Sequence, residues 1–152
     1  MVKFHADYLE AVENNQEPPR VTEFMGRCFL LIATRLINKN NFCGYRFKED
    51  MIGDATIDCV RYAHKFDPNR YNNPFAYFTT VCFYAFVRRI ESEKKYLYKK
   101  FKLINESEIF GLLHDSMDVD EKNIIHDIGY SESARENMMS FIETYEKKLE
   151  KK

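Results

Sequence analysis

Apolar residues recur every three or four positions along most of the chain, which is the spacing of one face of an α-helix. Between residues 20 and 38 this stripe consists of Val21, Met25, Phe29, Ile32 and Leu36. The polar run 38–44, NKNNFCG, then interrupts the period. We therefore expect a helix over residues 20–38 that ends in a polar loop.

A second helical pattern covers residues 47–65 and has two faces of opposite character. Its apolar side is formed by Met51, Ala55, Cys59 and Tyr62. Three aspartates at steps of four share another face, here called the acidic ridge: Asp50, Asp54 and Asp58. An amphipathic helix buries its apolar side. The acidic ridge is therefore expected on the surface, either as a solubilising face or as a docking surface for a basic partner.

Residues 66–74, FDPNRYNNP, carry turn signals and lead into a third, longer helix. Asn73 is a favourable N-cap, and Pro74 suits the first helical position. No helix breaker follows until about Asn105, which gives a length of roughly 30 residues, or about 45 Å. The buried stripe of this helix is Phe78, Cys82, Phe86 and Ile90. The stripe weakens beyond residue 90, so the later turns are expected to project from the core or to lie on a partner.

Composition agrees with an all-α globular protein. Hydrophobic residues make up 45% of the 152 residues, which suffices for a core, whereas five Gly and four Pro are few for a sandwich or barrel of short strands. We expect a compact helical domain over residues 1–104 that includes the long projecting helix. An acidic linker over 105–136 and a C-terminal helix or tail over 137–152 are expected to come after it.

Charge is divided sharply along the chain, although the net charge is only −1. Residues 84–103 hold seven Lys or Arg and two Glu, whereas residues 104–136 hold two basic and nine acidic residues. The overall balance excludes a globally basic protein that coats DNA, but it leaves room for a locally basic face. Residues 84–103, here called the basic segment, and residues 104–136, here called the acidic segment, are expected to form two different surfaces.

Aromatic residues alternate with cations in the basic segment. The rings are Tyr84, Tyr96, Tyr98 and Phe101, and the cations are Arg88, Arg89, Lys94, Lys95, Lys99, Lys100 and Lys102. Upstream, Tyr77, Thr80 and Tyr84 share one helical face. Cations attract phosphates by counterion release, and rings stack on unpaired bases. The pattern fits a surface that holds single-stranded DNA, and it also fits an ordinary solvated helix face.

Signals for other classes of protein are absent from the sequence. No nucleophile motif, phosphate-binding loop or metal-ligand spacing occurs, and the run 115–121, DSMDVDE, lacks the glycine of a calcium loop. The four cysteines have no CxxC spacing. Cys28, Cys59 and Cys82 sit among apolar residues at helical positions and are most simply buried free thiols of a reducing compartment. No run of apolar residues is long enough to span a membrane, and the first residues do not read as a signal peptide. We expect no catalytic residue, no metal, no cofactor and no membrane partner.

Residues 50–90 resemble the second conserved region of sigma-70 class transcription factors. The resemblance rests on the Lys65-Phe66-Asp67-Pro68 turn, on Tyr77 nine residues after that proline, and on an aromatic helix that turns basic. The longer run from NFCGYRF to KKYLYKKF, with the phrases NPFAY, CFYAFV and RRI, is similar to late-transcription sigma factors of T-even-type bacteriophages. It covers residues 28–103.

The resemblance implies two binding surfaces and a location in the cytoplasm of an infected bacterial host. The helix before the turn would dock on the clamp helices of the largest subunit of core RNA polymerase. Its expected contact residues are Asp50, Gly53, Asp54, Thr56 and Val60. The next helix would capture the nontemplate strand of an A/T-rich minus-ten-type promoter. The resemblance points to Tyr77, Tyr84, Val87 and Arg88 of that helix as DNA-binding residues. Thr80 on the same helix and the cations Arg89, Lys94 and Lys95 of the basic segment are expected to contact DNA with them.

The chain also departs from the family pattern. The paired Trp that open the duplex in housekeeping members fall at Thr80 and Val81, so melting would depend on an element whose TA steps unstack readily. The segment after residue 104 is expected to be too short for a helix-turn-helix domain that reads upstream DNA. The acidic segment is expected to occupy a basic channel of the polymerase.

The C-terminal run SFIETYE is similar in character to the clamp-binding tail of the phage proteins. Phe141, Ile142 and Tyr145 would then contact a sliding clamp, and a phage co-activator is a further implied partner. The competing interpretation is a simple helix that packs Phe141 and Ile142 inward.

Two other functions remain open from the sequence. A helical adaptor of RNA polymerase, such as an anti-sigma factor or an appropriator, would use the same polymerase surface without touching DNA. A small helical nuclease or metal enzyme is the second, although the sequence offers no cluster of carboxylates and histidines for it.

Overall fold

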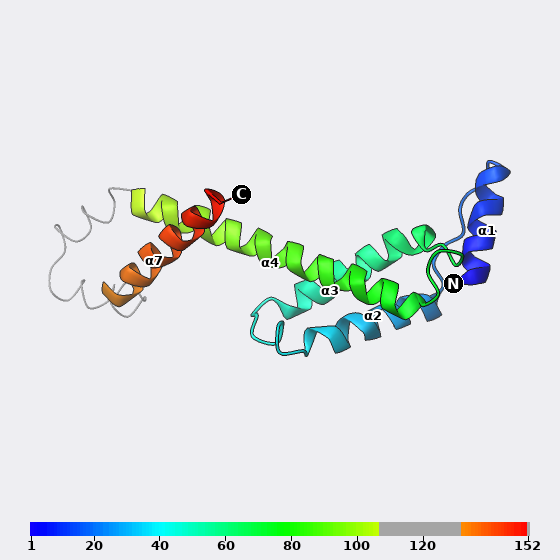
Figure 1. The fold of residues 1–152 in the computed structure, drawn as a ribbon, viewed down its shortest axis with the longest axis horizontal. Coiled ribbons are helices and arrows are strands. Elements are labelled where there is room, and N and C mark those ends of the chain that lie inside the picture. Colours follow the sequence, from blue (N-terminus) through cyan, green and yellow to red (C-terminus); the bar gives the residue numbers. More distant parts are fainter. Residues whose placement is uncertain (107–131, 152) are drawn as a thin grey trace. The chain divides into compact units, whose positions relative to one another are not determined.

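The computed structural model describes residues 1–106 and 132–151. They form the helices α1 (Val2–Glu13), α2 (Glu23–Ile37), α3 (Lys48–Tyr62), η1 (Ala63–Lys65), α4 (Pro74–Glu106) and α7 (Glu132–Leu149), with no strand (Figure 1). The expected all-α class is confirmed. None of these helices combines the length and the apolar character that crossing a bilayer would require.

The chain divides into two compact units, Met1–Glu91 and Ser92–Lys152, which are described separately. The division falls within α4, whereas the sequence placed a domain boundary at residue 104. Most of the expected acidic linker, 107–131, lies outside the described residues, and with it the expected contact with a polymerase channel. Its last residues already belong to α7, which begins at Glu132.

Side chains cap the starts of two helices, α2 and α4. Asn73 caps α4, because its Oδ1 accepts hydrogen bonds from the backbone N–H of Phe75 (3.0 Å) and of Ala76 (3.4 Å), as expected. Thr22 caps α2 by accepting from the N–H of Met25 at 3.3 Å. The cap explains why α2 begins at Glu23, later than the apolar stripe.

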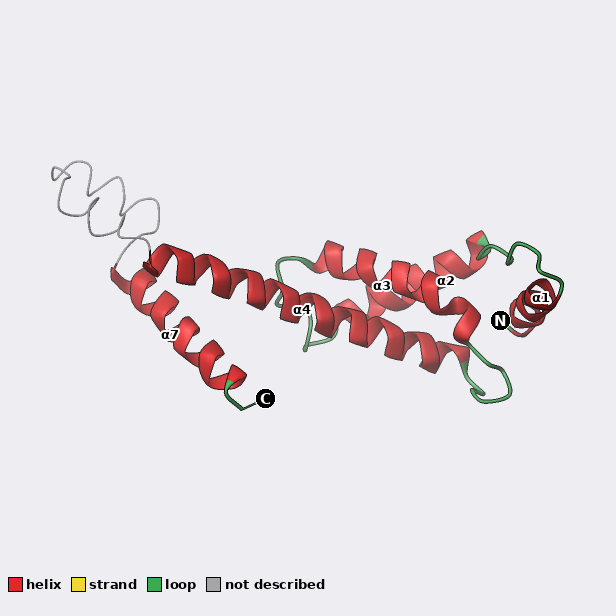
Figure 2. Cartoon of the chain, turned by 90° about the horizontal axis from the view of Figure 1, so that it is seen from above, coloured by secondary structure: helices red, strands yellow, loops and turns green. Residues whose placement is uncertain are grey.

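The first unit is built on one core shared by α2, α3 and the first half of α4, which lie side by side in both ribbon views (Figure 2). Its largest fully buried side chains are Phe66, Phe78, Phe86, Met51, Cys59 and Cys82. The expected stripe of α4 is buried at every position, and so are most positions of the α2 and α3 stripes. Local periodicity therefore identified the core correctly.

Tyr62 is an exception to this agreement. It was expected on the apolar side of α3, but it is 37% exposed, and the Lys65 ammonium lies 4.7 Å from its ring centroid. The chain tightens into η1 directly after Tyr62, so Ala63 and Phe66 fill the core in its place. The change from α-helix to 3₁₀-helix moves the buried face, which a constant period of 3.6 residues does not anticipate.

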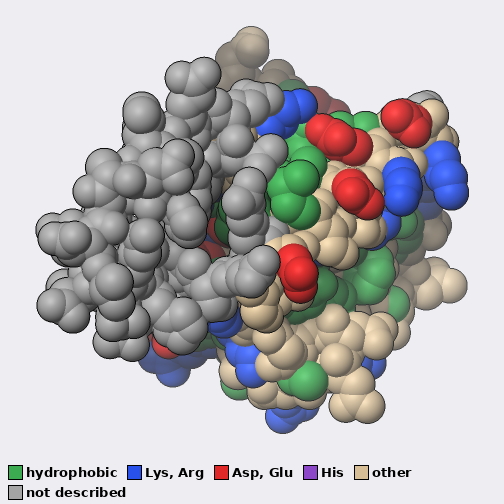
Figure 3. Space-filling model, turned by 90° about the vertical axis from the view of Figure 1, so that its left-hand side faces the viewer, with side chains coloured by type: hydrophobic (Ala, Val, Ile, Leu, Met, Phe, Trp, Pro, Cys, Tyr) green, Lys and Arg blue, Asp and Glu red, His purple; other side chains and the backbone are tan. Residues whose placement is uncertain are grey.

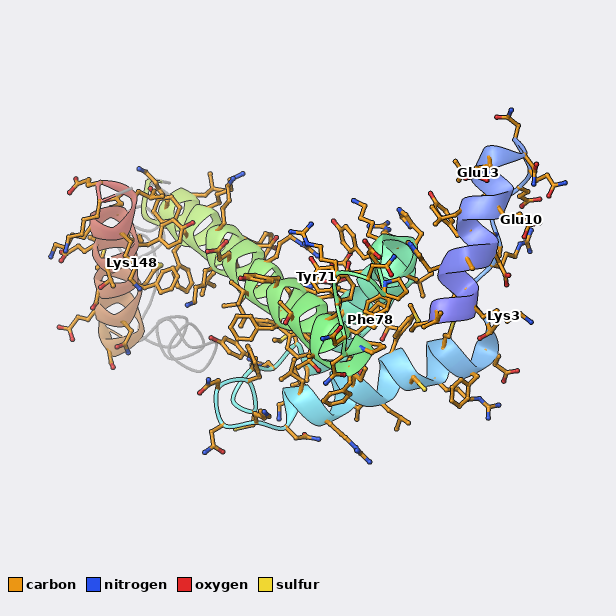
Figure 4. All side chains as sticks on the ribbon, turned by 45° about the vertical axis from the view of Figure 1, so that its right-hand side comes forward. Lys3, Glu10, Glu13, Tyr71, Phe78 and Lys148 are labelled. Carbon is orange, nitrogen blue, oxygen red and sulfur yellow. The ribbon has the colours of Figure 1, made fainter. Side chains whose placement is uncertain are left out.

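Helix α1 is attached to this unit mainly by two rings and buries little of its own length. The Tyr8 ring stacks on His64 of η1 with centroids 5.1 Å apart, and Phe4 packs against the core. Within α1 only Ala11 is buried. Lys3, Glu10 and Glu13 are exposed along it (Figure 4).

The second unit pairs the last turns of α4 with α7 through aromatic rings. Tyr98 stacks on Tyr145 with centroids 4.6 Å apart, and Phe101 meets Phe141 edge-on at 5.6 Å. Ile142 is 8% exposed. These contacts have the arrangement of the competing interpretation, an inward-packing helix, and the sliding-clamp contact stays a prediction.

Candidate nucleic-acid interface

The acidic ridge of α3 is largely engaged by arginines of α4. Asp54 forms a bidentate ion pair with Arg89, with Oδ2 2.7 Å from Nε and Oδ1 3.2 Å from Nη2. Asp58 forms a hydrogen-bonded ion pair with Arg88. Asp50 is exposed. The expectation of a fully exposed acidic ridge is wrong for Asp58, which is 7% exposed, because a helix thirty residues further along the sequence covers it.

The two arginines differ in what they leave available to a ligand. The Arg88 side chain is 59% exposed, whereas that of Arg89 is 28% exposed. A guanidinium has five N–H donors, and a carboxylate in a bidentate pair occupies two of them. Arg88 can therefore keep its contact with Asp58 and still present donors to a phosphate, while Arg89 acts mainly inside the protein.

The tyrosines expected to face DNA fall into two groups. Tyr84 is 64% exposed. Tyr77 is half-buried, with its ring centroid 5.4 Å from Phe66, 5.0 Å from Phe78 and 5.0 Å from Tyr71. Tyr71 and Phe78 are labelled in Figure 4. These ring contacts place Tyr77 at the rim of the core, where burial raises its pKa. Tyr84 is the more accessible of the two tyrosines.

A groove of about 360 Å³ opens beside Tyr84. It is lined by Leu36, Lys39, Asn41, Phe42, Thr79, Thr80, Phe83 and Tyr84. Phe83 is 41% exposed and stands edge-on to both Phe42 and Tyr84, with 5.7 Å between ring centroids in each pair. Rings, an ammonium and an amide thus meet in one concave place, which suits a planar polar ligand such as an unpaired base.

Six residues of this groove were not among the expected DNA-binding residues: Leu36, Lys39, Asn41, Phe42, Thr79 and Phe83. Lys39 and Asn41 belong to the polar loop after α2, which was interpreted as a helix breaker. Asn41, Phe42 and Phe83 lie in runs that carry the resemblance, but none of them was expected to contact DNA. Thr80, which was expected, lies in the groove, where its hydroxyl donates to the carbonyl of Ala76 at 3.0 Å. The hydroxyl oxygen of Thr80 is left to accept a hydrogen bond from a ligand.

The other expected DNA-binding residues lie further along α4. Val87 is half-buried. Lys94, Lys95 and Tyr96 are exposed and belong to the second unit. The ammonium groups of Lys94 and Lys95 are accessible to phosphates. On the face seen in Figure 3, the described acidic and basic side chains are interspersed instead of forming one patch of a single sign.

Three of the five expected polymerase-binding residues, Asp50, Gly53 and Val60, lie on one face of α3. Asp50, Gly53, Ile57 and Val60 succeed each other at steps of three and four. Ile57 is 51% exposed and Val60 is 42% exposed, which makes this face partly apolar. Ile57 was missed because the expected contact residues were carried over from the resemblance, which did not point to this position. The helical step between residues 53 and 57 is the signal that could have found it.

Thr56, another expected polymerase-binding residue, borders this face. The Thr56 hydroxyl donates to the carbonyl of Ile52 at 2.8 Å. Thr56 and Val60 also line a groove of about 740 Å³ toward α1, together with Phe4, Tyr8 and Leu30. A Cβ placed on Gly53 would meet no atom within 4 Å, so nothing in the fold requires glycine at this position.

No family model matches the chain, and no curated protein matches it.

Proposed function

We propose that this protein is a transcription initiation factor of the sigma type, similar to phage late factors. It binds bacterial core RNA polymerase through α3 and guides the enzyme to short A/T-rich promoters, where α4 captures the nontemplate strand. The observation that carries the proposal is the groove of Lys39, Asn41, Phe83 and Tyr84, with Arg88 one helical turn beyond Tyr84. The sequence resemblance over residues 28–103 supports the same assignment.

The groove offers the interactions that an unpaired base needs. Flipping a base out of a duplex costs a few kcal/mol. Stacking on aromatic side chains returns about 1–3 kcal/mol per base. Phe83 and Tyr84 supply rings, and Asn41 and Lys39 supply donors for a base edge or for the adjoining phosphate. The exposed donors of Arg88 would bind the backbone of the same strand.

The proposal makes the polymerase necessary for promoter binding. The chain has a net charge of −1, and two of its arginines already face aspartates. Few phosphates can then be neutralised, and affinity for duplex DNA depends on that number. Docking of the α3 face, with Asp50 and the apolar Ile57 and Val60, would hold α4 at DNA that the polymerase has bound. The factor itself carries out no chemistry, and it acts in the cytoplasm of the infected host.

Runoff transcription with bacterial core polymerase on A/T-rich templates tests this proposal. Transcripts are expected only when the protein is present. Tyr84→Ala is expected to lower their yield about tenfold or more, because one stacking ring is lost. Phe24→Ala is the matched control, since Phe24 is 76% exposed and lies outside both grooves. Tight binding of duplex promoter by the isolated protein would contradict the mechanism.

A polymerase adaptor that never contacts DNA is the second candidate. The ion pairs of Arg88 and Arg89 favour it, because basic groups that neutralise aspartates contribute less to a DNA surface. The Tyr84→Ala/Arg88→Ala variant separates the two functions in a polymerase pull-down run beside the transcription assay. Loss of transcripts with polymerase binding retained supports the initiation factor, and unchanged transcription supports the adaptor.

A further inference from the structure

Two thiols meet in the middle of the first unit. Cys59 of α3 and Cys82 of α4 have their Sγ atoms 3.5 Å apart, and both residues are completely buried. The Cys59 Sγ also lies 3.9 Å from the carbonyl oxygen of Phe78. Both cysteines are free, as are the half-buried Cys28 and the exposed Cys43.

We propose that Cys59 and Cys82 are an oxidation site, at which a peroxide converts the buried thiol pair into a disulfide that ties α3 to α4. The S–S bond length is about 2.05 Å, so the two sulfur atoms need to approach by less than one bond length. Rotation about the two Cα–Cβ bonds provides movement of this size. This inference stands apart from the proposed function, since it concerns only two side chains of the core.

The hydrogen bond between the thiols prepares them for unequal roles. It lowers the pKa of Cys82 and, together with burial, raises the pKa of Cys59. The Cys82 thiolate is therefore the nucleophile toward peroxide, because the thiolate and not the thiol reacts. The Cys59 thiol keeps its proton for the second step.

The reaction balances with hydrogen peroxide as the oxidant. The Cys82 thiolate attacks one peroxide oxygen and the O–O bond breaks. This step leaves a sulfenic acid on Cys82 and a hydroxide that takes up the proton released by Cys82. Cys59 sulfur then attacks the Cys82 sulfur, the S–O bond breaks, and the Cys59 proton leaves with the hydroxyl group as water. Two thiols and one peroxide yield one disulfide and two water molecules.

Burial decides which reagents reach the pair. A small peroxide can enter during brief openings of the core, whereas a bulky alkylating reagent reaches only Cys43 and, more slowly, Cys28 in the native state. The disulfide would close a loop between residues 23 positions apart. Such a loop restricts the unfolded chain, so the oxidised protein is expected to be more stable.

The test uses the full chain with Cys28→Ser and Cys43→Ser, treated with equimolar hydrogen peroxide under native conditions. We expect both remaining thiols to disappear in a titration in denaturant, and a peptide that links Cys59 to Cys82 to appear in non-reducing mass spectrometry. The Tm is expected to rise by about 5–10 °C and to return after reduction with dithiothreitol.

The added change Cys82→Ser is the matched control and should leave one thiol and an unchanged Tm. Two surviving thiols in the native protein, oxidation of either cysteine to sulfinic acid, or a disulfide that forms only in denaturant would overturn the proposal. If the two serine substitutions prevent folding, the protein with all four cysteines is treated in the same way. Peptide mapping then shows whether Cys59 is linked to Cys82.

Discussion

The two regions in which α4 contacts other helices are held together in different ways. In the first unit, α4 packs on α3 through fully buried rings and thiols, and the ion pairs lie at the edge of that core. In the second unit, α4 contacts α7 through half-buried rings and a network of Tyr98, Lys102 and Glu146 that is open to water. One helix therefore contributes a stable core at its beginning and a weak, pH-dependent contact at its end.

The largest expected effect comes from opening the first core. Phe86 is completely buried and meets Phe42 edge-on at 5.1 Å. Phe86→Ala is expected to lower the free energy of unfolding by about 3–5 kcal/mol, because a cavity remains where the ring was. Urea denaturation monitored by far-UV circular dichroism measures this loss.

Ile142→Ala provides the corresponding change in the second unit. Ile142 is 8% exposed and its neighbours Phe141 and Tyr145 are half-buried, so water can fill part of the space that the substitution leaves. We therefore expect the free energy of unfolding to fall by about 2 kcal/mol. Equal losses for the two variants would remove the contrast between the units.

Removing either partner of the Arg88–Asp58 ion pair is expected to destabilise the protein by unequal amounts. Arg88→Ala leaves the nearly buried Asp58 carboxylate without its nearest cation, and Arg61 lies 3.9 Å away. Asp58→Asn leaves an arginine that is already largely exposed. We expect a loss of about 1–3 kcal/mol for Arg88→Ala and about 1 kcal/mol or less for Asp58→Asn. Urea midpoints decide the order, and the reverse order would show that Asp58 is hydrated in the native state.

A substitution at Gly53 on the α3 face is expected to change stability and polymerase binding in opposite directions. Gly53 lies inside a helix with free space around it, so Gly53→Ala should raise the free energy of unfolding by about 0.5–1 kcal/mol. If this face binds polymerase as proposed, the added methyl group would weaken the pull-down while the Tm increases. An unchanged affinity would place the docking surface elsewhere.

The smallest effect is expected from the solvent-open network of the second unit. The Tyr98 hydroxyl, which donates to Glu146 at 2.8 Å, and then the Lys102 ammonium lower the pKa of Glu146. A lowered carboxyl pKa stabilises the folded form above the ordinary value of about 4.3, and this contribution is lost as the pH falls through the lowered pKa. Tyr98 and Glu146 raise the pKa of Lys102. Its stabilisation of the folded form is therefore fully present below about pH 10.4, the ordinary pKa of lysine, and is lost as the pH rises through the raised pKa.

Near-UV circular dichroism of the tyrosines as a function of pH reports on this contact. The signal of the Tyr98–Tyr145 stack is expected to decrease at both extremes, and Glu146→Gln should remove the acid limb. Glu143→Gln is the matched control, since Glu143 pairs along α7 with Lys147, at 3.8 Å. An identical acid limb in both variants would assign the transition to other groups.

The sequence by itself determined α2, α3 and α4 and most of the core they share. The stripe of Phe78, Cys82, Phe86 and Ile90 and the cap at Asn73 could be predicted because helix periodicity and capping depend on residues only a few positions apart. Tyr62 was misplaced because the change to a 3₁₀ turn depends on how the chain enters the next loop.

Only the tertiary structure decided the partners of the side chains. It placed Arg89 on Asp54, Cys82 beside Cys59, and Lys39 in one groove with Tyr84, although each pair is separated by 23 residues or more. A helical pattern fixes which face of a helix is apolar, but not the rotation and the register with which two helices pack. The acidic ridge and the basic segment were both visible in the sequence, and their pairing was not, because that packing is set by the whole core at once.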